Sequence, residues 1–144
     1  MTDFTAQVLG FDFGTKRIGV AYGQTISETT KPLKELKAQN GIPLWQEIAD
    51  LIALWQPNCL LVGLPLNMDG SENDQCLRAK KFAKRLHGRF GLPCYLWDER
   101  LTSKSIKQSM PQKNYREQPI DSLAACAIIE SWFFNDCPKI SALN

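Results

Sequence analysis

Residues 8–24, VLGFDFGTKRIGVAYGQ, decide the fold, because they predict two strands joined by a tight turn. The run begins with apolar residues that are numerous enough for a strand buried on both faces. From residue 18 onward, apolar side chains alternate with small ones, which predicts a second strand. Residues 14–17, GTKR, supply the glycine and polar side chains that a hairpin connection needs.

Asp12 is the anomaly in this hairpin. A carboxylate between Phe11 and Phe13 is costly to bury unless a cation or a hydrogen-bond donor meets it. A metal ion, the N–H groups of the turn, or the cations Lys16 and Arg17 could each do so. On this segment alone, a structural role in closing the turn and a functional role remain equally open.

The composition is that of an ordinary globular protein. The 144 residues are 44% hydrophobic and 22% charged, which predicts a single domain over residues 1–144. The net charge of +2 is too small to indicate a nucleic-acid partner by itself. Five scattered cysteines, with no C-x-x-C pair, favour a reducing compartment. We find no basic leader followed by an apolar run and no stretch of transmembrane length, so we expect a soluble, cytoplasmic protein.

The rest of the chain alternates strands and helices. Gly41 is expected to open the first helix, with Leu44 on its buried face, and Ser71 with Asp74 three residues later predicts a capping box for the second. This order implies an α/β fold in which a mixed five-stranded sheet, its second strand antiparallel, has helices on both faces. The remaining segments predicted are an edge strand at 28–37, a helix over 41–56, a strand at 59–64, a loop at 65–72, a helix to about 87, a strand at 94–97, a short helix from 102 or 103, a loop at 111–119 and a helix over 120–134.

Carboxylates gather where the parallel strands of this sheet should end. Asp12 lies near the end of the first strand, and Asp98 and Glu99 end the third. Because adjacent residues of an extended chain point to opposite faces, only one of that pair can meet Asp12, and spacing does not say which. Asp121 opens the last helix and could bring a third carboxylate. Such oxygen ligands suit Mg²⁺ or Mn²⁺.

Basic side chains accompany this predicted cluster. Lys16, Arg17 and Arg100 could hold phosphates beside it. Purely structural roles are also open for the acids. Asp121 could stabilise a helix N-terminus, and Asp98 or Glu99 could form a salt bridge with Arg100.

The helix that ends near residue 87 has a basic outer face. This face is either solvated or contacts phosphates, and we favour the second interpretation. We therefore predict that Arg78, Lys81 and Arg85 contact the substrate.

Four motifs resemble those of the YqgF/RuvX family and occur in the family's order. They are LGFDFGTKRIGVA at 9–21, VGLPLNMDGS at 62–71, WDERLT at 97–102 and DSLAA at 121–125. The resemblance spans nearly the whole chain. It implies an RNase H-like fold related to Holliday junction resolvases and a metal-dependent nuclease that matures the 5′ end of precursor 16S ribosomal RNA.

The resemblance also implies roles for particular residues. Asp12, Glu99 and Asp121 would be the catalytic and metal-binding acids, and this choice of Glu99 over Asp98 comes from the resemblance alone. The glycine-rich loop at 63–70 would approach the substrate backbone, with Gly63 and Asn67 as its contacts. The partner would be precursor 16S ribosomal RNA or the small ribosomal subunit, bound by a monomer or a weak homodimer.

The chain departs from related patterns at two places. Many family members have Ser-Asp where this chain has Tyr22-Gly23, so we expect no acid there. True resolvases bear another carboxylate one turn into the final helix, where this chain has Ala124. The three remaining carboxylates make cleavage of branched DNA the second choice.

Two further interpretations remain open. One is a non-catalytic nucleic-acid-binding factor that acts in transcription. The other starts from residues 12–15, DFGT, which also resemble the phosphate loop of actin-like ATPases, but 144 residues leave no room for the second domain of that fold.

Overall fold

The first two strands form the hairpin that the sequence predicts. In the computed structural model, which describes residues 6–101, 120–135 and 142–143, β1 (Gln7–Asp12) pairs antiparallel with β2 (Arg17–Gln24). Asp12 is the last residue of β1 and lies opposite Gly19. In the turn, a Cβ atom on Gly14 would lie 2.5 Å from the carbonyl oxygen of Arg17, so this close connection requires glycine.

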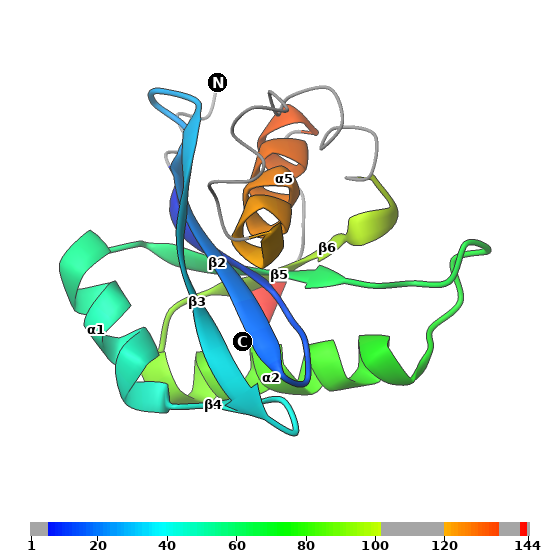
Figure 1. Cartoon of the computed structure of the whole chain (residues 1–144). Coiled ribbons are helices and arrows are strands. Elements are labelled where there is room, and N and C mark those ends of the chain that lie inside the picture. The colour runs from blue at the N-terminus through cyan, green and yellow to red at the C-terminus, as the bar shows by residue number, and fades with distance from the viewer. Residues whose placement is uncertain (1–5, 102–119, 136–141, 144) are drawn as a thin grey trace.

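The hairpin is part of a mixed sheet with the strand order β4-β3-β2-β1-β5-β6-β7 (Figure 1). The parallel strands are β1, β5 (Cys59–Leu64) and β6 (Cys94–Asp98), and β3 (Thr29–Gln39) runs antiparallel to β2. Two-residue strands, β4 (Ile42–Pro43) and β7 (Ala142–Leu143), add to the edges. The five longer strands are the five predicted ones. The prediction omitted β4 and β7 because two residues carry too little pattern to recognise.

Within the described residues the helices are α1 (Trp45–Trp55), α2 (Asp74–Phe90) and α5 (Ile120–Phe134), with a 3₁₀ turn, η1 (Glu99–Leu101), after β6. The bounds of α5 are those predicted. The short helix expected from residue 102 or 103 and the loop at 111–119 lie outside the described residues.

Two predicted helix starts are wrong. Gly41 does not open a helix, because its positive φ of 79° and the following strand β4 form a turn, which leaves Leu44 at the N-cap of α1 and 69% exposed. The capping box at Ser71 is also wrong. Asn73 caps α2 by accepting a hydrogen bond from the Cys76 N–H at 2.8 Å, and the Ser71 hydroxyl donates to Asp69 instead.

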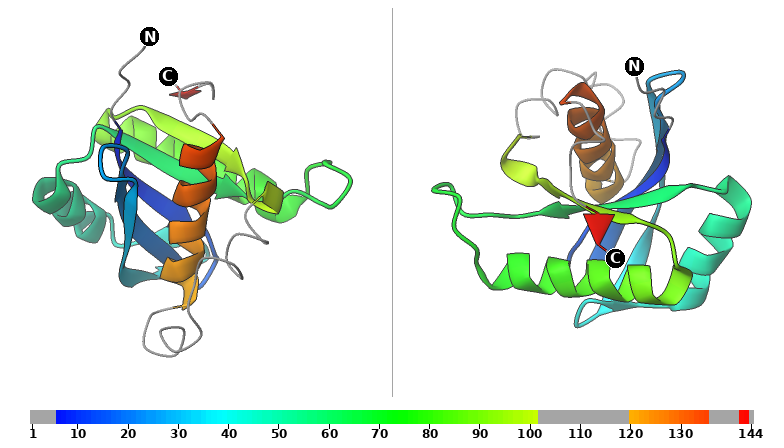
Figure 2. Two further views of the ribbon diagram at one scale, coloured as in Figure 1. Left: turned by 90° about the horizontal axis from the view of Figure 1, so that it is seen from above. Right: turned by 180° about the vertical axis from the view of Figure 1, so that it is seen from behind.

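Helices cover both faces of the sheet (Figures 1 and 2). α5 lies on one face, and α1 and α2 lie on the other. Along β1, Leu9 and Phe11 pack in the core on the α1 and α2 side, whereas Val8 packs in the core beneath α5. Because this alternation continues along the strand, it directs Asp12 toward the α5 side.

Four of the five cysteines lie within the described residues. Cys59, Cys76, Cys94 and Cys126 are buried, and none of the described cysteines forms a disulfide. Cys137 lies outside the described residues. Of the helices that can be described, none has the length and apolar character needed to cross a membrane.

Candidate active site

Two of the predicted acids meet at the carboxyl ends of the parallel strands. Asp12 ends β1, and Glu99 opens η1 directly after β6. A hydrogen bond joins their carboxyl groups. Burial, followed by the charge of Asp12, raises the pKa of Glu99 to about 8. The fold therefore holds two acidic groups together, and in the metal-free protein Glu99 keeps its proton to unusually high pH.

Gly63 makes room for this pair. It lies in β5, between β1, which ends at Asp12, and β6, which Glu99 follows. A Cβ atom at Gly63 would lie 2.7 Å from Glu99 Cγ and 2.6 Å from Ile128 Cδ1 of α5, both too close for any real side chain. The Glu99 side chain therefore crosses β5 over the bare backbone of Gly63. The sequence analysis assigned Gly63 to substrate contact. In the structure, the absence of a side chain at Gly63 leaves room for Glu99 beneath α5.

The first turn of α5 is fastened near Asp12. The Val20 N–H donates a hydrogen bond of 3.2 Å to the hydroxyl of Ser122, which is fully buried. Val20 follows Gly19, the partner of Asp12, at an irregularity in the pairing of β2 with β3. Since Asp121 precedes Ser122, its backbone lies at this end of α5, while its side chain is outside the described residues. Sequence reasoning missed Ser122, because a partner 102 positions away leaves no local signal.

Asp98 binds Arg100. The Arg100 guanidinium donates to both Asp98 carboxylate oxygens, at 2.6 to 3.1 Å. These bonds hold the pKa of Asp98 below its usual range. Arg100 also donates to the carbonyl oxygen of Met68 at 3.0 Å. The salt bridge considered for Asp98 is thus present, and Arg100 ties the end of β6 to the loop that follows β5.

That loop is organised by its own hydrogen bonds. The side chain of Asn67 donates to the Ser71 hydroxyl at 3.0 Å and accepts from Asn73 at 2.8 Å. Asn73 also donates to the carbonyl oxygen of Pro65 at 2.9 Å. The amide of Asn67 is therefore engaged inside the loop, and its predicted contact with substrate remains a prediction.

Lys16 and Arg17 lie at the β1–β2 turn, on the same edge of the sheet as Asp12. Both are exposed, and Arg17 is 3.9 Å from a carboxylate oxygen of Glu35. The turn is braced against the β3–β4 turn by two backbone bonds, Ala38 N–H to Lys16 C=O at 2.8 Å and Gly41 N–H to Thr15 C=O at 2.9 Å. The two cations therefore extend from a fixed backbone.

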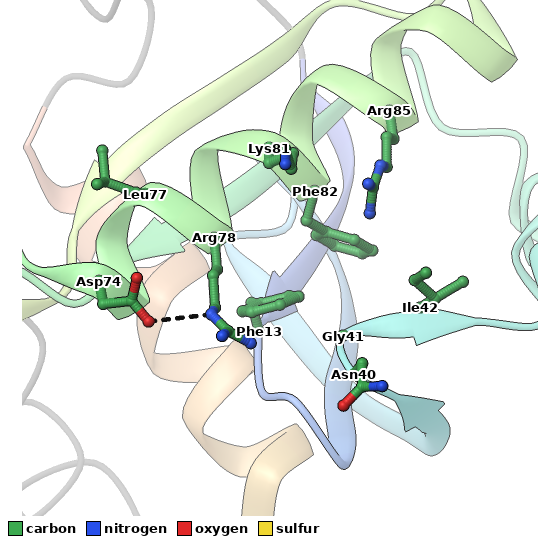
Figure 3. Close-up of a pocket in the computed structure, with 10 residues that line it drawn as sticks. All are labelled: Phe13, Asn40, Gly41, Ile42, Asp74, Leu77, Arg78, Lys81, Phe82 and Arg85. Atoms are coloured by element: carbon green, nitrogen blue, oxygen red, sulfur yellow. Dashed lines mark hydrogen bonds and ion pairs between the residues drawn. The ribbon is translucent and has the colours of Figure 1, made fainter.

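The three predicted substrate contacts of α2 come together around one cleft, on the other face of the sheet (Figure 3). Arg78, Lys81 and Arg85 line it, and Arg78 also pairs with Asp74 at 3.1 Å. No acidic residue lies between Gln75 and Gly91, so the basic residues of this stretch have no acidic partner within it. Two acids at the N-terminal end of α2 do form pairs, Asp74 with Arg78 and Glu72 with Lys80.

The Asp12–Glu99 pair fits a hard divalent cation. Two carboxyl groups in contact, one with a raised pKa, form an oxygen donor set whose repulsion a cation would relieve. Among the described side chains, no group of three or more His, Cys, Asp and Glu residues is placed to hold a metal. The third predicted ligand, Asp121, lies outside that set.

Comparisons with known proteins point to one family. A family model described as "RuvX: Holliday junction resolvase" matches residues 6–135. A protein of Pseudomonas fluorescens (strain SBW25) named "Putative pre-16S rRNA nuclease" is 49% identical over 130 residues, 87% of this chain and 90% of its own. A protein of Histophilus somni (strain 2336) with the same name is 53% identical over 132 residues, 89% of this chain and 94% of its own.

A solved structure has the same fold. "T. thermophilus RuvC in complex with Holliday junction substrate" matches with a TM-score of 0.63 over 97% of this chain and 100% of its own, at 14% sequence identity. This match confirms the RNase H-like architecture that the sequence motifs implied.

Proposed function

The chain belongs to the RuvX family, and from that premise we propose that it is a metal-dependent endonuclease that processes the 5′ end of precursor 16S ribosomal RNA. The names of the relatives support the substrate. The observation that carries the chemistry is the contact of Asp12 with Glu99 at the carboxyl ends of β1 and β6. Residues 1–144 would form a single nuclease domain that works in the cytoplasm.

Asp12, Glu99 and Asp121 would hold the metal, Mg²⁺ or Mn²⁺. When bound, the ion supplies Lewis-acid chemistry, because it lowers the pKa of a water and stabilises negative charge on phosphodiester oxygens. Three features support this assignment. Asp12 and Glu99 are already in contact, Gly63 fixes the path of Glu99, and the Ser122–Val20 bond keeps the start of α5 beside β2.

The predicted cations would position the RNA. Lys16 and Arg17 extend from the braced β1–β2 turn at the same edge as the acids, and the α2 residues Arg78, Lys81 and Arg85 gather at one cleft. Arg100 would contact a phosphate while it holds the loop after β5, and Gly63 and Asn67 would let that loop approach the RNA backbone. The binding partner would be the precursor RNA or the small ribosomal subunit.

Cleavage of a labelled 16S precursor 5′ leader tests the proposal, on free RNA and on the small subunit. Wild type with Mg²⁺ or Mn²⁺ should cut the leader, whereas EDTA or Asp12→Asn should abolish cutting and leave RNA binding intact. If Asp12→Asn cuts like wild type, the proposed site is wrong. If wild type binds the RNA but cuts neither form, a non-catalytic binding factor replaces the nuclease.

A second candidate function is resolution of branched DNA, which the description of the family model favours. That reaction needs a dimer that presents two sites, so a strictly monomeric protein would count against it. Ala124 also stands where true resolvases bear another carboxylate. A four-way DNA junction incubated in parallel with the RNA leader distinguishes the two, because we expect the leader to be cut and the junction to remain whole.

A further inference from the structure

A cleft of about 390 Å³ lies between α2 and the β3–β4 turn. Arg78, Lys81 and Arg85 border it from α2, and Asn40, Gly41 and Ile42 border it from the turn (Figure 3). Its volume is at the small end of the range for ligand pockets, which suits one nucleotide and not a duplex.

The cleft is strongly cationic. Spacings of three and four residues place Arg78, Lys81 and Arg85 along one side of α2. Of the described residues that line the cleft, Asp74 is the one carboxylate, and it pairs with Arg78. Lys81 and Arg85 are both exposed at its border. Side chains of this kind bind the phosphates of a nucleic acid strand.

An aromatic ring forms part of the wall. Phe13 is half-buried and packs on the fully buried Phe82, with their ring centroids 5.3 Å apart. Gly41, at a φ of 79°, lets the turn approach closely, since a Cβ atom there would lie 2.7 Å from Phe13 Cζ. The ring is thereby held at the cleft, where a base could pack against it. An aromatic face combined with cations is the usual means of binding an unpaired base and its phosphates.

The cleft adjoins the acidic pair through the backbone of β1. Asp12 is directed to the α5 face, where it meets Glu99, and its neighbour Phe13 contacts α2 on the opposite face. The cleft and the acidic pair therefore lie on opposite faces at the same end of the sheet, joined by consecutive residues of the chain.

We propose that this cleft binds one unpaired nucleotide of the RNA next to the cleavage site, its base on Phe13 and its phosphates on Lys81 and Arg85. The inference rests on the proposed function for the identity of the strand as substrate. It adds that the substrate is single-stranded on this side of the cut, and that Phe13 selects for an unpaired base.

Binding in the absence of catalysis tests this inference. The probe is a fluorescein-labelled single-stranded RNA of about ten nucleotides, titrated in EDTA with full-length Asp12→Asn protein and read by anisotropy. Adding Phe13→Leu should weaken binding about tenfold, because a stacked base is lost while the side chain stays apolar. The same RNA annealed to its complement should bind more weakly and show no effect of Phe13→Leu.

The cations have a matched control on the same helix. Lys81→Gln with Arg85→Gln should make the slope of log binding constant against log salt about 1.4 shallower, as expected for two lost phosphate contacts of a single strand. Lys84→Gln removes an exposed charge of α2 outside the cleft and should leave both affinity and slope close to the parent values. Thermal unfolding shows whether Phe13→Leu folds. If it does not, the comparison of the Lys81 and Arg85 variant with Lys84→Gln still tests the cleft.

The inference is overturned if Phe13→Leu folds and binds the single strand like its parent, or if Lys84→Gln weakens binding as much as the Lys81 and Arg85 changes. These results are independent of the nuclease assignment. A wild-type protein that cuts no RNA would refute the proposed function, yet cleft-dependent binding of the single strand would still support the cleft.

Discussion

The α5 face of the sheet and the α2 face hold their helices by different means. Beneath α5 the sheet has no room for a side chain at Gly10 or Gly23, since a Cβ atom on either would lie 2.6 to 2.7 Å from Ile129. Hydrogen bonds then cross the interface, from Thr30 to Glu130 at 2.7 Å and from Trp97 to Ser131 at 2.9 Å. Large apolar side chains fill both faces, with Trp132 beneath α5 and Phe11 and Phe82 beneath α2, so the glycines and these hydrogen bonds are what mark the α5 side.

This difference assigns separate tasks to the two faces. Close, hydrogen-bonded packing fixes the position of α5 and of the Asp12–Glu99 pair beneath it, as a site that must hold acidic groups in place requires. The rings of Phe11, Phe13 and Phe82 on the α2 face stabilise the fold by apolar burial, with centroids 5.3 to 5.6 Å apart, and leave a cleft at its border. Changes next to the Asp12–Glu99 pair on the α5 face should therefore alter chemistry, and changes inside the α2 face should alter stability.

A cavity in the α2 face should destabilise the protein without changing its chemistry. Leu86 is fully buried on α2 and does not line the cleft. Leu86→Ala should lower the free energy of unfolding by about 2–5 kcal/mol. Cleavage per folded molecule should stay near the wild-type rate, as measured well below the melting temperature. A rate loss of tenfold or more in the folded protein would contradict the division between the faces.

Filling the space at Gly63 should damage the chemistry. Gly63→Ala forces Glu99 and Ile128 to move. Because small displacements of a catalytic group are costly, we expect the cleavage rate to fall about a hundredfold. Overpacking should also cost about 1–3 kcal/mol of stability. Gly88→Ala is the control, because nothing lies within 4 Å of a Cβ atom there, and it should be neutral or stabilising. Equal cleavage rates for the two variants would refute the role of Gly63.

Metal should stabilise the protein through the acidic pair. At a Mg²⁺ concentration about a hundredfold above its dissociation constant, the free energy of unfolding should rise by about 2.7 kcal/mol. Thermal unfolding with Mg²⁺ and with EDTA measures this difference. In Asp12→Asn the rise should largely vanish, because one ligand of the pair is lost. An equal rise in both proteins would place the metal elsewhere.

Two serines of α5 distinguish the positioning of the active site from the stability of the fold. Ser122→Ala leaves the buried Val20 N–H unpaired, and Ser131→Ala leaves the Trp97 ring N–H without its hydroxyl partner. Each should cost about 1–3 kcal/mol of stability. Only Ser122→Ala should also slow cleavage, since it loosens the turn that begins beside Asp12. Similar cleavage losses in both variants would show that the tether at Ser122 has no special role.

Local patterns were sufficient for most of the fold. Alternation and apolar runs located the five longer strands, and the apolar run after residue 120 located both ends of α5. They failed at the start of α1, where the left-handed backbone of Gly41 makes a turn, and at the start of α2, where Asn73 and not Ser71 is the cap. Both errors concern which of several suitable residues the backbone uses.

The candidate site was predictable in outline only. The alternation of side chains along a strand predicted that only one of Asp98 and Glu99 would meet Asp12. In the structure Glu99 contacts Asp12, and Asp98 binds Arg100. The space at Gly63 could not be predicted, because it depends on a neighbouring strand and on α5. The catalytic roles of Asp12, Glu99 and Asp121 remain predictions, and the side chain of Asp121 lies outside the described residues.

The central claim is that the Asp12–Glu99 pair performs metal-dependent hydrolysis, and single-turnover cleavage of the labelled 16S precursor leader tests it most directly. With saturating Mg²⁺, Glu99→Gln should lower the rate by about a thousandfold or more, because several kcal/mol of charge stabilisation depend on the metal ligands. The variant should still fold and bind the leader. A Glu99→Gln protein that cleaves at the wild-type rate would contradict the account.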